Sequence, residues 1–291
     1  KKGGVDIFTP YSFSYDTLGR ITSTTNQDGT TDYTYDKTSQ LTAADHSYQT
    51  DETYTFDANG NRTMTGYTTG SNNRLTSDGT YNYTYDDEGN RTLRTKISDG
   101  SKTEYGWDYR NRLASVIEKN SSNVVLERTD YFYDGFNRLI RRTHDADGAG
   151  AGAAVDAFFI HEGNQIALQF DGASASDLTN RYLWGPAIDQ ILADEQVTSL
   201  GSAGNIIWPL TDHLGTTRDL ADYNEGNGVT SVTNHRIFNA YGLLVDESNA
   251  AIDHLFGFTA RPYDEATDLQ NNLNRWYDAA LGQWLSEDPI G

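Results

Sequence analysis

The chain has 291 residues and a formal net charge of −20, because 22 Lys and Arg face 42 Asp and Glu. This balance argues against a nucleic-acid binder, which needs clustered basic groups for phosphate contacts, and against adhesion to anionic membranes. Cys is absent, which excludes disulfide scaffolds and thiolate metal sites. No apolar run reaches the roughly 20 residues of a membrane span, so membrane insertion is not expected.

The composition favours strands over helices. There are 19 Tyr, 11 Phe and 5 Trp beside 27 Gly, with only 5 Pro and 1 Met. Tyr and Thr favour strands, whereas Gly, Asn and Asp mark turns. The composition therefore predicts an all-β chain with many short strands.

A phrase built on Tyr-Asp recurs through the first half of the chain. Its Asp residues follow one another at intervals of about 20–30 residues, a spacing typical of repeat proteins. They are Asp16, Asp36, Asp57, Asp86, Asp108 and Asp134. Before each Asp, aromatic residues alternate with small polar ones, as in a strand with two unlike faces.

Each copy is predicted to be a hairpin. The Asp would accept hydrogen bonds from nearby backbone N–H groups in the turn, and the return strand opens with a pair such as Arg112-Leu113 or Arg138-Leu139. A lone hairpin is marginally stable in water, so we expect the copies to pair edge to edge into one large, curved antiparallel sheet. The six Asp residues then have a structural role in turns.

Charge separates two halves of the chain. Residues 1–150 carry 17 basic and 22 acidic residues, a net of 17 − 22 = −5, whereas residues 151–291 carry 5 and 20, a net of 5 − 20 = −15. A Gly/Ala-rich stretch at 145–154 lies at this boundary and is expected to be a loop. Its Gly-x-Gly spacing lacks the helix start, Lys and Ser/Thr of a phosphate loop.

Further strands are expected in the second half, at 157–160, 165–170 and 206–210. The segment 190–195 is compatible with either a strand or a helix, and a strand is favoured. The six His residues show no His-Glu-x-x-His spacing, so neither a metal site nor a cofactor is predicted. Around Asp212 and His213, a hairpin turn is favoured over a metal or acid–base cluster.

Three later motifs, taken with the repeats, carry a resemblance to a known family. They are Tyr182-Leu183-Trp184-Gly185-Pro186, the stretch from Leu210 to Arg218 that contains Asp-His-Leu-Gly, and the stretch from Trp276 to Gly291 that ends in Asp-Pro-Ile-Gly. The chain resembles the Rhs/YD-repeat family over essentially its whole length. The resemblance implies a YD-repeat sheet over 1–144 and a repeat-associated core domain over 155–291.

In that family, YD repeats spiral into a hollow β-shell that encloses a C-terminal segment, commonly a toxin. Relatives include the shell-closing subunits of toxin complexes and the extracellular teneurins. The resemblance implies that the partners of this chain are its own C-terminal cargo segment and the rest of the shell, and that it is secreted or exposed at a cell surface. A bacterial export route is expected, although the chain carries no targeting signal.

The resemblance also implies an aspartyl-protease-like self-cleavage that releases the cargo. Such chemistry needs two carboxylates that share a proton, and an Arg can orient one of them. The family's Arg falls on Arg275 and its first catalytic Asp falls on Asp288, while the second Asp and the cut are expected beyond Gly291. This chain alone is therefore not expected to cleave itself. The alternatives are a turn role for Asp288 and a structural ion pair for Arg275.

A second function stays open at this point. Rows of exposed Tyr and Trp beside Asp and Asn would suit an extracellular adhesin that stacks its rings on carbohydrate and has no catalytic activity. Packing of those rings within the sheet is the simpler interpretation, because cross-strand aromatic pairs stabilise sheets by roughly 0.2–1 kcal/mol each.

Overall fold

The structure is a computed structural model that describes residues 10–288. All its regular elements are strands and three short 3₁₀ helices, which confirms the all-β prediction. The chain forms two compact units, residues 1–80 and 81–291, and each is described by itself. The division into 1–144 and 155–291, which rests on composition and on the family resemblance, stays a prediction.

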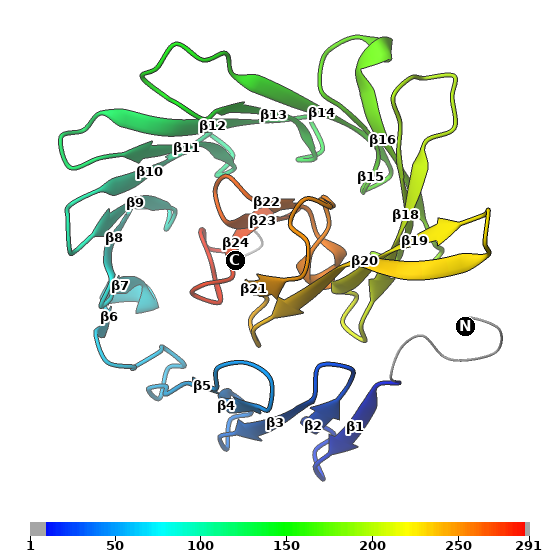
Figure 1. The fold of residues 1–291 in the computed structure, drawn as a ribbon. Coiled ribbons are helices and arrows are strands. Elements are labelled where there is room, and N and C mark those ends of the chain that lie inside the picture. Colours follow the sequence, from blue (N-terminus) through cyan, green and yellow to red (C-terminus); the bar gives the residue numbers. More distant parts are fainter. Residues whose placement is uncertain (1–9, 289–291) are drawn as a thin grey trace. The chain divides into compact units, whose positions relative to one another are not determined.

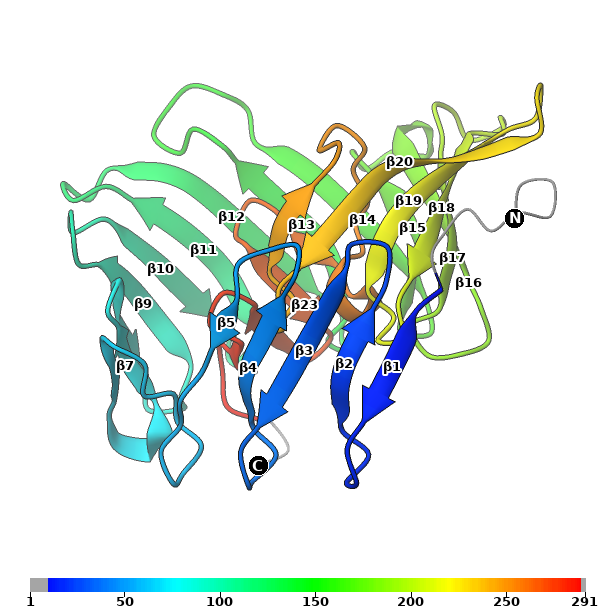
Figure 2. The ribbon, with the colours of Figure 1, turned by 60° about the horizontal axis from the view of Figure 1, so that its bottom comes forward.

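The first unit contains a five-stranded antiparallel sheet in chain order (Figure 2). Its strands are β1 (Ser12–Tyr15), β2 (Ile21–Thr25), β3 (Thr30–Tyr35), β4 (Leu41–His46) and β5 (Glu52–Thr53). A further antiparallel hairpin follows, made of β6 (Tyr67–Thr69) and β7 (Leu75–Asp78) on either side of the 3₁₀ helix η1 (Ser71–Asn73). This is the hairpin-by-hairpin order that the repeats predict.

The second unit is built on a large antiparallel sheet in which each strand from β8 to β21 pairs with its neighbours in sequence. Its first strands are β8 (Tyr81–Tyr85), β9 (Arg91–Lys96), β10 (Lys102–Trp107), β11 (Leu113–Lys119), β12 (Val125–Tyr133), β13 (Leu139–Asp145) and β14 (Val155–Glu162). The sheet continues with β15 (Gln165–Phe170), β16 (Leu178–Trp184), β17 (Ile191–Gln196), β18 (Asn205–Thr211), β19 (Thr217–Asn224), β20 (Val229–Phe238) and β21 (Leu244–Glu247). The helix η2 (Ala175–Asp177) precedes β16.

A small four-stranded sheet completes this unit. It consists of β22 (Tyr263–Asp264), β23 (Leu269–Asn272), β24 (Arg275–Asp278) and β25 (Gln283–Trp284), and the helix η3 (Phe258–Ala260) precedes it. Figure 1 shows the large sheet of this unit curving around the small one. The expected strands at 157–160, 165–170 and 206–210 are confirmed, and the ambiguous segment at 190–195 is strand β17.

The hydrogen bonds of the repeat turn explain why Asp is used in it. Asp134 accepts from the backbone N–H groups of Phe136 at 2.8 Å and Arg138 at 3.0 Å. The residue three positions after the Asp has a positive φ, 86° for Gly89 and 67° for Asn137, and the strand register shifts there. Such a turn followed by a left-handed residue and a bulge matches the right-handed twist of the strands.

The same pattern holds at the other predicted turns. Each Asp accepts from a backbone N–H two or four residues later, at Asp16, Asp36, Asp57, Asp86 and Asp108. Asp212, where a hairpin was expected, does so too. Asn120 and Asn239 form equivalent turns that sequence reasoning missed.

The aromatic residue directly before the Asp joins neighbouring repeats. The Tyr133 hydroxyl donates to the carbonyl oxygen of Leu113 at 2.7 Å, and the Trp107 indole N–H donates to that of Arg91 at 2.7 Å. The arginine at the end of the turn bonds to the following repeat instead: Arg112 Nη1 donates to the carbonyl oxygen of Asp134 at 3.0 Å. The Tyr-Asp phrase therefore fixes each hairpin to the next as well as its own turn.

Aromatic rows exist, but arginines interrupt them across strands. Rings contact each other along one strand, as Tyr81 and Tyr83 do at 6.4 Å between centroids. Guanidinium groups lie over ring faces: that of Arg94 lies 4.7 Å from the centroid of the same Tyr81 ring, and that of Arg112 lies 4.8 Å from the centroid of the Tyr133 ring. A cation over a ring face is attracted by its quadrupole, so these rings are used within the sheet.

The core of the second unit lies between the inner face of the large sheet and the C-terminal segment. The apolar residues that open the return strands, Leu113 and Leu139, pack in one cluster with Phe256, Trp276 and Leu285. The Gly/Ala-rich stretch lies outside this core, because residues 146–154 form the connection between β13 and β14. These two strands pair, so the sheet continues across the change in charge.

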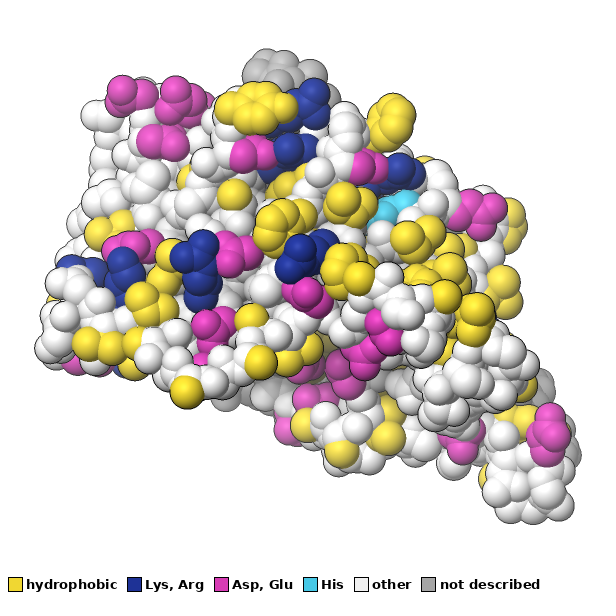
Figure 3. Space-filling model, turned by 90° about the horizontal axis from the view of Figure 1, so that it is seen from above, with side chains coloured by type: hydrophobic (Ala, Val, Ile, Leu, Met, Phe, Trp, Pro, Cys, Tyr) yellow, Lys and Arg dark blue, Asp and Glu magenta, His cyan; other side chains and the backbone are white. Residues whose placement is uncertain are grey.

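The outer face near β12–β16 is mixed in character. Acidic, basic and apolar side chains intermingle on this side of the molecule (Figure 3). Exposed apolar residues include Phe132, Ile140, Ile160 and Leu183. Since the apolar groups are dispersed among charges, this face resembles an ordinary protein surface.

Replacing Tyr133 with Phe is expected to lower the free energy of unfolding by about 1–3 kcal/mol, because buried polar groups lose their partners. The Tyr133 hydroxyl donates to Leu113 and also accepts from the Trp276 indole N–H at 2.8 Å. Urea unfolding measures the change. The matched control is Tyr109→Phe, where the side chain is 89% exposed. Equal free energies of unfolding for the two variants would show that the Tyr133 hydrogen bonds make no net contribution to stability.

Candidate functional site

The structure brings Arg275 and Asp288 together. Arg275 begins β24, and its Nη2 lies 3.1 Å from Oδ2 of Asp288, in the segment after β25. The Arg275 guanidinium also stacks on the Trp284 ring, 4.2 Å from its centroid. The Asp288 side chain is 52% exposed and that of Arg275 is 23% exposed. The ion pair therefore holds the partly exposed Asp288 carboxylate against Arg275.

The segment that carries Asp288 is attached to the start of the large sheet. The carbonyl oxygen of Leu285 accepts from the backbone N–H of Arg91 at 2.8 Å. Beside it, the Glu287 side chain fills the space where a side chain at Gly89 would lie. Asp288 thus emerges next to the turn between β8 and β9.

An arginine beside a carboxylate fixes the orientation of the carboxylate. This suits one member of an aspartyl pair, and it also suits a structural ion pair. The remaining residues of the Asp-Pro-x-Gly motif, Pro289, Ile290 and Gly291, lie outside the described residues. The catalytic role of Arg275 and Asp288 therefore stays a prediction.

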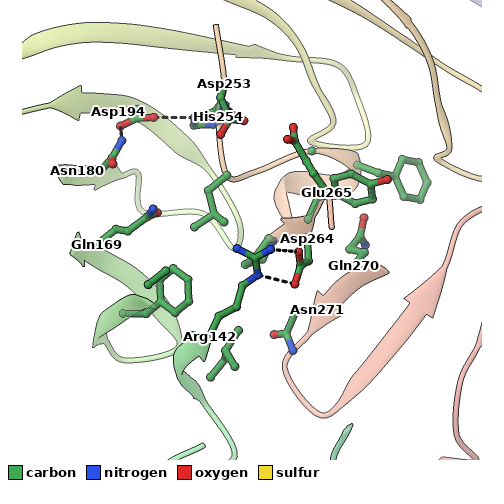
Figure 4. A pocket seen from close by; sticks show the side chains of 18 of the residues that line it. Arg142, Gln169, Asn180, Asp194, Asp253, His254, Asp264, Glu265, Gln270 and Asn271 are labelled. Atoms are coloured by element: carbon green, nitrogen blue, oxygen red, sulfur yellow. Dashed lines mark hydrogen bonds and ion pairs between the residues drawn. The ribbon is translucent and has the colours of Figure 1, made fainter. Parts of the chain in front are cut away.

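The second unit also contains a cavity of about 270 Å³ between the inner face of the large sheet and the small sheet (Figure 4). Its lining combines aromatic rings with charged groups. The charged residues are Arg142, Asp194, Arg236, Asp253, Asp264 and Glu265, with His254 beside them. Sequence reasoning found no site here, because these residues come from distant strands and share no motif.

Two fixed pairs form part of its wall. Arg142 makes a forked contact with Asp264, Nε to Oδ2 at 2.8 Å and Nη2 to Oδ1 at 2.7 Å (Figure 4). The Tyr131 hydroxyl donates to the same carboxylate at 2.6 Å. Burial, together with the adjacent Asp264 charge, raises the pKa of Tyr131 well above its usual value, so the hydroxyl remains a proton donor.

The other pair joins His254 to Asp194. Nδ1 of His254 lies 2.9 Å from Oδ2 of Asp194, and the Asn180 amide donates to Oδ1 at 2.7 Å (Figure 4). Both side chains of the pair are almost completely buried. Two fixed partners hold the Asp194 carboxylate, so this end of the cavity is rigid.

A pH effect is expected from His161 in β14, which lines a second, very small cavity. Burial, with a contribution from the Arg138 guanidinium, lowers the pKa of His161 to about 4. The unfolded chain takes up this proton near pH 6.5. The contribution of neutral His161 to the free energy of unfolding is therefore fully present above pH 6.5 and is lost as the pH falls towards 4.

Urea unfolding near pH 7 and near pH 4.5 measures this loss. The wild type is expected to lose more stability between the two than His161→Gln, which cannot take up the proton. Exposed His213→Gln is the control and should behave as the wild type does. If the free energy of unfolding depended on pH equally in the wild type and His161→Gln, His161 would not be the cause of the pH effect.

Two negative findings apply to the described residues. Over residues 10–288, no group of three or more His, Asp or Glu side chains is placed to hold a metal ion. No helix in this range is long and apolar enough to cross a membrane.

Comparison with known sequences identifies the architecture. The family model for the teneurin YD-shell matches residues 3–290. The double-stranded DNA deaminase toxin A of Burkholderia cenocepacia is 26% identical over 96% of this chain and 20% of its own length. The tRNA nuclease WapA of Bacillus subtilis is 28% identical over 88% of this chain and 10% of its own length. The chain thus spans a fifth or less of these relatives.

A solved structure supports the fold. The Photorhabdus luminescens Tc holotoxin pore contains a chain that superposes with a TM-score of 0.70 at 16% identity, over 97% of this chain and 15% of that one. The paired hairpins, the Tyr-Asp turns and the match over nearly the whole sequence lead to one conclusion. The chain belongs to the teneurin YD-shell family, which confirms the resemblance to YD-repeat proteins that its repeats and later motifs carry.

Proposed function

We propose that this chain is a wall segment of a hollow β-shell that encloses a toxin-like polypeptide continuing from its C-terminal side. The family match over residues 3–290 carries the proposal. The sheet of the second unit supports it, because its pairs follow the chain order from β8 to β21 and it curves around the C-terminal segment. In such a wall, successive hairpins pair edge to edge, and the inner side of the sheet faces the enclosed polypeptide.

The proposal extends to release of the enclosed segment. Arg275 and Asp288 would contribute part of an aspartyl-protease-like site, with Asp288 as one carboxylate of the pair and Arg275 as the residue that positions it. Their ion pair at 3.1 Å supports this assignment. The partners are then the enclosed segment and the remaining shell, and the protein acts after secretion or at a cell surface.

Carbohydrate binding has less support as the alternative. Stacking on a sugar needs an open ring face, whereas the faces of Tyr35, Tyr81 and Tyr133 are each covered by an arginine guanidinium. These rings contribute to the sheet and are not available as a platform.

Protease protection of the parent protein tests the enclosure. An epitope tag is placed within the polypeptide that follows residue 291, and the intact protein is treated with proteinase K. The tag is expected to survive until urea unfolds the shell. The same tagged polypeptide, expressed alone, should be digested at once. Equal digestion of the tag in both proteins would overturn the enclosure.

A further inference from the structure

The cavity of the second unit has more acidic groups than cations at its mouth. The Asp253 side chain is 71% exposed, and its nearest arginine nitrogen, Nη2 of Arg236, is 3.9 Å away. Within the described residues, the Glu265 carboxylate makes no hydrogen bond or ion pair. Arg142, the other arginine of the lining, is occupied by Asp264. Arg236 is shared with Glu247, so the mouth carries a net negative charge.

The raised pKa of Glu265 is what a site with too little positive charge would produce. Partial burial, followed by repulsion from Asp253, raises the pKa of Glu265, and the Arg236 charge offsets only part of this. A positive group placed between the two carboxylates would relieve both effects, because an opposite charge nearby favours the ionised form.

Aromatic side chains form a large part of the remaining lining. Tyr182, Phe258, Tyr263 and Trp276 all contribute to it. Ring faces attract cations, most strongly where water is excluded. Carboxylates at the mouth of an aromatic cavity favour an ammonium or guanidinium group over an anionic or purely apolar ligand.

Two buried hydrogen-bond donors in the same lining indicate which groups of the ligand would lie beside its cationic group. Asn271 is 5% exposed and its Nδ2 has no hydrogen-bond partner. The Arg236 side chain is 6% exposed, and its Nε makes no hydrogen bond, although it lies 3.7 Å from Oε2 of Glu247. Unsatisfied buried donors are costly and uncommon in native structures, and both nitrogens are obligate donors. They would be satisfied by neutral acceptors such as peptide carbonyl oxygens.

We infer that this cavity binds a lysine or arginine residue of a polypeptide, with its cationic group at Asp253 and Glu265 and its main-chain carbonyls near Arg236 and Asn271. A volume of about 270 Å³ lies below the roughly 300–1,000 Å³ of sites for drug-sized ligands, so it suits a single amino-acid residue, with its main chain inside and its side chain extended to the mouth. The inference rests on the proposed function to this extent: the polypeptide is the enclosed segment, and the cavity anchors a basic residue of it.

Binding of short peptides to the full chain tests the inference by isothermal titration calorimetry. The probe is acetyl-Gly-Arg-Gly-amide, and the matched control peptide carries citrulline, which keeps the shape of arginine without its charge. Saturable binding of the arginine peptide is expected, with affinity at least about tenfold lower for the citrulline peptide. Glu265→Gln and Asp253→Asn should each weaken binding of the arginine peptide by about tenfold.

Glu225→Gln separates a specific site from the general attraction of an acidic protein. Glu225 is exposed in the connection between β19 and β20, and its replacement should leave binding unchanged. Glu265→Gln removes a charge from an exposed side chain and should not destabilise the fold, which thermal unfolding checks. Equal affinity for the two peptides, or equal effects of the Glu225 and Glu265 changes, would overturn the inference.

Absence of binding by both the arginine peptide and its lysine counterpart would also overturn it. Protection of the tagged polypeptide from proteinase K does not depend on this cavity. A chain that fails to bind the peptides while the parent still protects its tag would refute the anchoring site alone and leave the enclosure standing.

Discussion

Replacing Arg91 with alanine is expected to lower the free energy of unfolding by about 3–5 kcal/mol, the cost of leaving one partner of a buried ion pair alone. The Arg91 side chain is completely buried at the start of β9, and its Nη1 donates to Oδ2 of Asp278 in β24 at 2.8 Å. Its guanidinium also stacks on the Tyr83 ring, 4.8 Å from the centroid. Burial is the largest single effect and disfavours the charge of Arg91, but the Asp278 carboxylate, together with Tyr105 and Tyr85, outweighs it and raises the pKa of Arg91.

Urea unfolding of the full chain measures the effect. The control is Arg128→Ala, which removes an exposed pair with Asp130 and should cost less than about 1 kcal/mol. A double variant, Arg91→Met with Asp278→Leu, should recover most of the loss, because apolar groups of similar volume often replace a buried pair at little cost. A loss no larger than that of Arg128→Ala would contradict the anchoring role of Arg91.

In the parent protein, Asp288→Asn is expected to slow self-cleavage by roughly 10²–10⁴-fold, the usual effect of removing an acid–base group. The reason is that the amide cannot share or transfer the proton that an aspartyl pair needs. The readout is the mass of the purified protein, since the wild type should be split beyond Asp288 and the variant should be intact. Exposed Glu225→Gln should be split as the wild type is.

Arg275 is expected to act by positioning Asp288. Arg275→Lys keeps a positive charge near the carboxylate and should retain part of the cleavage rate, whereas Arg275→Gln should lose most of it. Intact mass followed over time distinguishes the two. Equal rates in Arg275→Gln and the wild type would reduce the ion pair to a structural contact. Splitting of Asp288→Asn at the wild-type rate would remove Asp288 from the mechanism.

The repeat turns could be predicted from sequence because their physics is local. An Asp that accepts from N–H groups two and four residues away carries its whole signature within five positions. Asn239 was missed although it forms the same turn, because the search followed Asp after an aromatic residue. A pattern that accepts Asp or Asn with Gly three positions later would have found it, since Gly242 has a φ of 88°.

The anchoring pair and the cavity could not be predicted in the same way. Arg91 and Asp278 are 187 positions apart, and Arg91 follows its turn aspartate by five positions as Arg62 does, so its local sequence does not mark a distant partner. The cavity collects residues from β12 to β24, so its charge balance exists only in the folded sheet. Arg275 and Asp288 were found through the family resemblance, because no local rule relates a strand arginine to an aspartate 13 positions later.

We propose that this chain forms the wall of a shell around the polypeptide that follows it. An electron cryomicroscopy reconstruction of the parent protein tests this directly. The account predicts that the sheet of residues 81–288 continues into further YD repeats and that density for the following polypeptide lies on its inner side. Density for that polypeptide on the outer side of the sheet, or an inner side without it in the uncleaved protein, would contradict the account.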